Sequence, residues 1–228
     1  MAMVTIGYCD TPEDLRELAS SVIEELTGEK PPEKQFPMLA GPNEFIQLIA
    51  DAGVWHAIAF AAGGTVVAGA TAFSTKFMGK LGEKAADSVW DSRKKLAKAF
   101  AGAVTAPFRR LGEIVRKGRE TKRAVILALP SNSLRGMGTE LTSDDPVDIA
   151  WKMRLLGKHG PKAVEAFEKL WKSGLGTIDT NPDGSLKIYV EDDGRVILRK
   201  VRHGADRENW IEEVILYQPK TPGVIDDE

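Results

Sequence analysis

VTIGYCDTPEDLRELASSVIEEL, residues 4–26, decides how the chain begins to fold. Its first six residues are rich in β-branched and aromatic side chains, which favour a short strand. Thr11 and Pro12 then suit the start of a helix, and Asp14 stands where the acid of a capping box is expected. Apolar side chains recur on one face of that helix, at Leu15, Leu18, Ala19, Val22, Ile23 and Leu26. The segment predicts a strand followed by a helix that packs on a sheet.

Further along the chain, strand patterns are separated by a long stretch of helix-forming residues. AVILALP (124–130) predicts a strand in the middle of the chain. The segments LKIYV, RVILRKV and WIEEVILY predict a β-rich end, with EDDG as the turn between the first two. These strands lie far apart in the sequence, so they must be brought together by the segments between them.

Helices are predicted on both sides of the middle strand. Residues 27–43 contain four prolines and predict a loop, after which a helix resumes near Glu44 with Phe45, Leu48 and Ile49 facing inward. A later helix opens at Asp145–Pro146, and the residues from Gly157 to Pro161 are expected to turn the chain into another helix.

These elements predict an α+β fold over a single domain, residues 1–228. We expect a mostly antiparallel sheet, built from strands at both chain ends and one in the middle. A large helical insertion, about 44–123, is rich in alanine and glycine, then basic, and is long enough to form a subdomain.

Composition narrows the class of protein. Apolar residues make up 43% of the 228 residues and charged residues 28%, which is typical of globular proteins. The lone cysteine, Cys9, excludes an internal disulfide and a cysteine-rich zinc site. The first residues do not resemble a secretory signal, so a cytoplasmic protein is expected, with peripheral attachment to a membrane as an extension of that expectation.

Charge is distributed unevenly along the chain. Residues 1–53 carry 3 basic and 10 acidic side chains, whereas residues 76–123 carry 14 basic and 5 acidic ones. The remainder, residues 124–228, carries 14 basic and 18 acidic side chains, for a total net charge of −2. A basic middle between acidic arms can bind an anionic surface, or the arms can cover it; complementary regions of one solvated domain are the more ordinary interpretation.

Residues 52–75 contain no Asp, Glu, Lys or Arg and are long enough for a helix that crosses a bilayer. Lys76, Lys80 and Lys84 follow, as in the flank of a membrane span. However, the stretch has no leucine and is rich in Ala, Gly and Thr, which favours a helix buried in a folded domain. A conditional membrane binder and a single membrane span remain as alternatives.

The basic segment 93–123 predicts an amphipathic helix that can present a surface to a membrane or a partner. A helix packed on the core with a solvated basic side is the more ordinary interpretation. An approximate apolar stripe is formed by Leu96, Phe100, Val104, Phe108, Leu111 and Val115. The cations predicted to contact the membrane or partner are Lys94, Lys95, Lys98, Arg109, Arg110, Arg116 and Lys117. Nucleic acid is a disfavoured partner, because Phe100 and Phe108 are better explained as core than as a stacking platform.

The polar loop predicted at 131–145 is the candidate ligand site. Glycine-rich loops with hydroxyl groups and an arginine can hold an anion. The candidate ligand-binding residues are Ser131, Asn132, Ser133, Arg135, Gly136, Gly138 and Thr139, with Arg135 as the anion contact. A phosphate-binding P-loop motif is absent, and a mobile surface loop is the more ordinary interpretation.

No complete catalytic motif occurs in the chain, and we predict no catalytic residues, no metal ligands and no cofactor. The favoured prediction is a non-enzymatic intracellular binding protein that uses its helical middle. Its partner would be another protein, a second copy of the chain or an anionic membrane surface. One alternative is an enzyme or a binder of a small anion or nucleotide that uses the 131–145 loop. Another is a single-span membrane protein, through residues 52–75.

Overall fold

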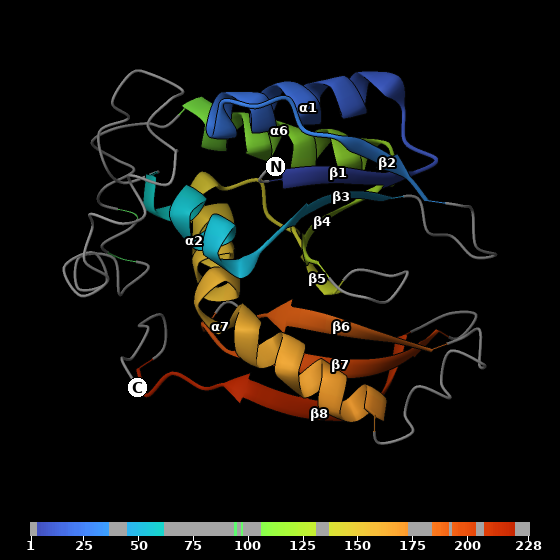
Figure 1. Ribbon diagram of the computed structural model, residues 1–228, viewed down its shortest axis with the longest axis vertical. Coiled ribbons are helices and arrows are strands. Elements are labelled where there is room, and N and C mark those ends of the chain that lie inside the picture. The colour runs from blue at the N-terminus through green and yellow to red at the C-terminus, as the bar shows by residue number, and fades with distance from the viewer. Residues whose placement is uncertain are drawn as a thin grey trace.

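The computed structural model contains two β-sheets and the helices that pack on them, so the α+β class is confirmed. Figure 1 shows helices α1 (Glu13–Thr27) and α6 (Ala106–Glu120) side by side next to the larger sheet, with the smaller sheet beyond strand β5 (Met137–Glu140). Helix α7 (Pro146–Lys172) runs from beside α2 (Ala52–Ala61) to the smaller sheet. The residues that the structure describes are 4–36, 45–61, 94, 97, 106–130, 137–172, 184–191, 193–203 and 208–221.

The larger sheet has five strands in the order β2-β1-β3-β4-β5. Its members are β1 (Val4–Cys9), β2 (Glu33–Gln35), β3 (Phe45–Ala50), β4 (Ala124–Leu129) and β5 (Met137–Glu140). Pairs β1–β3 and β4–β5 are antiparallel, whereas β1–β2 and β3–β4 are parallel. The prediction of a mostly antiparallel sheet is wrong, because long connections return β2 and β4 in the direction of their neighbours.

The smaller sheet is a three-stranded antiparallel unit, as the sequence predicted for the end of the chain. Its strands are β6 (Gly184–Val190), β7 (Val196–His203) and β8 (Glu208–Tyr217), in that order. Gly194 has a φ of 94° in the β6–β7 turn, a conformation that favours glycine. The amide of Glu191 donates to the oxygen of Arg195 at 2.9 Å and closes that turn.

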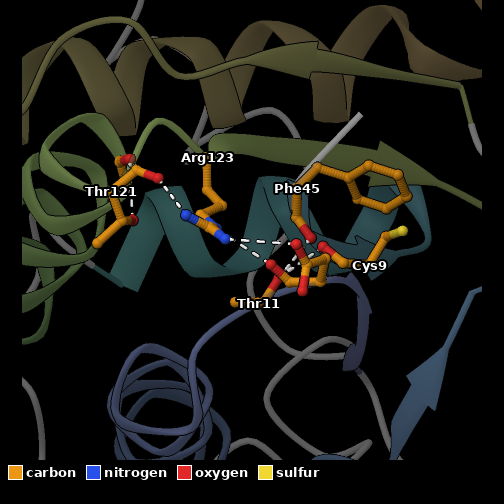
Figure 2. Close-up of polar contacts among 7 residues, drawn as sticks. Cys9, Thr11, Phe45, Thr121 and Arg123 are labelled. Atoms are coloured by element: carbon orange, nitrogen blue, oxygen red, sulfur yellow. Dashed lines mark hydrogen bonds and ion pairs between the residues drawn. The ribbon is translucent and has the colours of Figure 1, made fainter. Parts of the chain in front are cut away.

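Helix α1 (Glu13–Thr27) confirms the predicted apolar face. Leu15, Ala19, Val22 and Ile23 are buried. The predicted capping box is wrong, since Pro12 is the N-cap residue and no side chain caps the helix. Thr11 is used elsewhere: its hydroxyl donates to the backbone oxygen of Phe45 at 2.8 Å, across the strand ends (Figure 2).

The helix predicted near Glu44 is wrong over residues 45–50, which form strand β3. Phe45, Leu48 and Ile49 have helical spacing, but Ile46 and Leu48 point to the core while Gln47 on the opposite face is also buried. A strand buried on both faces has a nearly continuous apolar run, which resembles a short helix in sequence. The insertion at 44–123 is therefore not wholly helical.

The turn predicted from Gly157 to Pro161 is also wrong, because helix α7 (Pro146–Lys172) runs through it. The glycine at 157 permits close contact with helix α2 (Ala52–Ala61). A Cβ atom at Gly157 would lie 2.6 Å from the backbone nitrogen of His56, so a larger residue would clash. The glycine serves helix packing rather than a turn.

One hydrophobic core joins α1, α2, helix α6 (Ala106–Glu120) and α7 to the two sheets. Trp55 of α2 is fully buried, and its indole nitrogen donates to the oxygen of Ala128 in β4 at 3.0 Å. Of the helices within the described ranges, none is both long and apolar enough to cross a membrane. Residues 62–75, the rest of the apolar stretch, lie outside those ranges.

Candidate binding surface on helices α1 and α6

Helix α6 carries the described part of the predicted basic surface. Its apolar stripe is confirmed where the structure describes it, since Phe108, Leu111 and Val115 are each 1% exposed. The other stripe positions, Leu96, Phe100 and Val104, lie outside the described residues. The cations of α6 must therefore lie on its flanks and its outer side.

Two of the predicted surface cations face helix α1. Arg110 binds Glu25 at 2.6 Å and donates to the hydroxyl of Ser21 at 2.9 Å. Lys117 lies 3.2 Å from the carboxylate of Asp14, in the first turn of α1. Both pairs are solvent-exposed, so each adds little stability, but together they fix the two helices side by side and neutralise two cations.

The C-terminal end of α6 is held by a third ion pair. Arg119 lies 2.8 Å from the carboxylate of Asp144, in the segment that precedes α7. A backbone hydrogen bond at Asp144 itself, followed by the hydrogen bond from Arg119, lowers the pKa of this carboxyl below its ordinary value. The ionised carboxylate is thus the form that the fold favours.

The outer side of α6 presents a row of four exposed side chains, Arg109, Glu113, Arg116 and Glu120. Spacings of four, three and four residues place them on one helical face. We call these four residues the outer row. The exposed outer side of α1 is acidic, with Glu13, Glu17 and Glu24. The surface formed by the two helices is therefore mixed in charge rather than uniformly basic.

Of the other predicted surface cations, Lys94 is the one that lies within the described residues. Lys94 is helical and exposed. Lys95 and Lys98 lie outside the described residues. The structure therefore places Arg109 and Arg116 together on the outer row and directs Arg110 and Lys117 toward α1.

The predicted 131–145 loop is shorter than expected, because residues 137–140 form β5. Thr139 is 3% exposed and pairs with Leu127, and a Cβ at Gly138 would lie 2.6 Å from the Leu127 oxygen. Both residues are therefore part of the sheet. The period-two pattern of Thr139 and Leu141, both buried, was the available signal for this strand. Outside the described residues lie Ser131, Asn132, Ser133, Arg135 and Gly136.

The described residues offer little that is typical of a reaction centre. Cys9 is buried at the end of β1. Within the described ranges, no group of three or more His, Cys, Asp or Glu side chains could hold a metal ion. No protein-family model matches the chain, and neither the curated proteins nor the solved structures give a match. The function must be inferred from the surface itself.

Proposed function

We propose that the protein is a non-enzymatic intracellular binding protein whose helical middle contacts a partner protein. The observation that supports this best is the outer row of α6. Its four long charged side chains project from a helix whose opposite side is buried and whose flank is ion-paired to α1. Side chains on a rigid element are positioned for recognition without further ordering of the backbone.

The mixed charge of this surface favours a protein over an anionic membrane. A uniformly anionic surface attracts Arg109 and Arg116 but repels Glu113 and Glu120 on the same row. Arg110 and Lys117 already bind the Glu25 and Asp14 carboxylates. A partner with alternating charges can pair with every member of the row, which provides specificity more than affinity.

Affinity capture from the source cells with a charge-reversed variant tests the proposal. Arg116→Glu is expected to lose a partner that the wild-type chain captures, because two outer-row carboxylates and the new one then repel the partner's anions. Lys30→Glu makes the same charge change at an exposed position after α1 and should retain the partner. Equal capture by both variants would show that the outer row is not the contact.

The membrane alternative predicts a different result with vesicles of phosphatidylcholine and phosphatidylserine. We expect the wild-type chain to remain in the supernatant at low salt. Pelleting that is lost at high salt, and lost in the variant carrying Arg109→Glu with Arg116→Glu, would instead support an anionic membrane as the partner.

A further inference from the structure

Strand β8 forms an open edge of the smaller sheet. The strand order is β6-β7-β8, so β7 pairs with one side of β8 only, as Figure 1 shows. The opposite edge strand, β6, lies next to β5 of the larger sheet. Within the part of the chain that the structure describes, Val214, Ile215 and Leu216 make no hydrogen bond outside the β7 ladder. Their outward backbone N–H and C=O groups can therefore pair with a further strand.

A row of apolar side chains crosses this sheet and ends at the open edge. The strand registers pair Tyr189 with Ile197 and Ile197 with Ile215. This row lies on the face opposite to Leu198, which is buried in the main core. Ile197 is fully buried, whereas Ile215 is 53% exposed and is the exposed large hydrophobic side chain among the described residues. The apolar row thus stops at a side chain that lacks cover.

The residues on either side of Ile215 are apolar as well. Val214 and Leu216 are half-buried and pack against the main core. The register of β8 shifts beside Leu216, which leaves this residue without an opposite residue on β7. Such a bulge interrupts the regular strand, so a partner strand can pair over a short stretch only. The edge offers an uncharged run of three residues, Val214–Leu216.

The charges next to this run are already paired within the chain. Arg199 is 7% exposed and lies 2.7 Å from Glu213 and 2.9 Å from Glu191. Because the Glu213 carboxylate is bound to this guanidinium, it gives the edge little attraction for a basic partner. Backbone hydrogen bonds and apolar contact are therefore the chemistry that a partner must supply here.

We propose that this edge is the contact between two copies of the chain, whose β8 strands pair antiparallel. The two-fold axis is perpendicular to the sheet and passes between Ile215 and the partner's Ile215. Val214 then lies opposite the partner's Leu216 on the core side. The two three-stranded sheets become one six-stranded sheet, and the exposed side chain of Ile215 is covered by its own copy.

The strand register is what identifies a second copy as the occupant. Centred on Ile215, the pairing makes the apolar row of Tyr189, Ile197 and Ile215 continuous with the same row of the partner, in reverse order. A register centred on Glu213 would place two carboxylates opposite each other, which is unfavourable. A register centred on Val214 would place Ile215 opposite the partner's Glu213. The inference does not depend on the partner proposed for α6, because neither α1 nor α6 belongs to this edge.

Charge complementation at position 215 tests the proposal by sedimentation equilibrium of the full chain. The wild type is expected to dimerise. Ile215→Lys and Ile215→Glu should each weaken the dimer about tenfold or more, because each places like charges opposite each other across the axis. An equimolar mixture of the two variants should dimerise again, since a lysine then lies opposite a glutamate. This recovery requires that position 215 of one copy meets position 215 of the other.

Two controls distinguish the contact from a general effect of charge. Glu17→Lys and Lys30→Glu introduce the same side chains at exposed positions on and after α1, and both should leave the dimer unchanged. Urea denaturation should show that both variants at the exposed position 215 remain folded. The proposal is overturned if the wild type is monomeric at about 1 mM, the weak end of specific association. It is equally overturned if both variants dimerise like the wild type, or if their mixture associates no more tightly than either variant alone.

Discussion

Arg123 donates a hydrogen bond from Nε to the backbone oxygen of Asp10, 3.0 Å away, and so joins the start of β4 to the end of β1 (Figure 2). Its Nη2 atom lies 3.5 Å from the Asp10 carboxylate, and its Nη1 atom donates to the backbone oxygen of Thr121. Asp10 has a φ of 43°, in the left-handed region that aspartate tolerates better than most residues. One guanidinium thus fixes two turns at the same end of the sheet, one after β1 and one before β4.

Replacing Arg123 by alanine should lower the free energy of unfolding by about 1–3 kcal/mol, because two backbone oxygens lose their charged donor. Lysine should recover only part of this loss, since it cannot reproduce the planar fork. Urea denaturation of each variant measures its free energy of unfolding. Arg109→Ala, on the exposed outer row, is the control and should change stability by no more than about 0.5 kcal/mol. Similar losses for Arg123→Ala and Arg109→Ala would contradict this role.

Asp144 should make stability depend on acid pH. Its carboxyl has a lowered pKa in the folded chain, so the ionised form stabilises the fold above the ordinary value of 3.8. That stabilisation is lost as the pH falls through the folded-state value. Asp144→Asn should therefore be less stable than the wild type at neutral pH, and the difference should shrink at about pH 3.

Urea denaturation of the wild type and of Asp144→Asn, at neutral pH and at about pH 3, measures this difference in stability. Glu113→Gln removes an exposed carboxylate from the outer row and serves as the control for loss of charge alone. A difference between Asp144→Asn and wild type that is the same at both pH values would show that ionisation of Asp144 is not linked to folding.

The face of α1 can be tested with three substitutions of graded burial. Val22 is 0% exposed, Leu18 is half-buried and Glu17 is exposed. Val22→Asp should prevent folding or cost more than about 3 kcal/mol, because it buries an unpaired charge. Leu18→Asp should cost less, and Glu17→Lys should be almost neutral. Soluble yield and urea denaturation check the order; equal effects at positions 17 and 22 would mean that the wrong face is buried.

Local patterns were sufficient for β1, α1, β4 and the three terminal strands, because each has a clear period and clear boundaries. They were insufficient for β3, whose residues FIQLIA fit a helical period as well as a strand. The deciding factor was the pairing of β3 with both β1 and β4, a long-range contact that gives each face of the strand its own burial.

The candidate surface on α1 and α6 depends even more on contacts between residues that are far apart in the sequence. The sequence identified the cations of α6, but it did not show that Arg110 and Lys117 would bind acids more than 80 positions away. The sequence shows the type of each residue, but the residues that lie next to it in space depend on how the helices and strands are arranged.

The final prediction concerns the contact between α2 and α7. Alanine normally stabilises a helix interior by about 1 kcal/mol relative to glycine. At Gly157 the new Cβ would lie 2.6 Å from the backbone nitrogen of His56, which cannot move aside as a flexible side chain would. Gly157→Ala should therefore lower the free energy of unfolding by about 1–3 kcal/mol through overpacking.

Gly53→Ala provides the matched control, because no atom lies within 4 Å of a Cβ built at Gly53 in α2. There the helix propensity of alanine should act alone and leave stability unchanged or raise it by up to about 1 kcal/mol. Urea denaturation of both variants measures the contrast. If Gly157→Ala were as stable as Gly53→Ala, the two helices would not approach as closely as the Gly157–His56 contact requires. The glycine would then have to be explained by the nearby Pro161 rather than by packing.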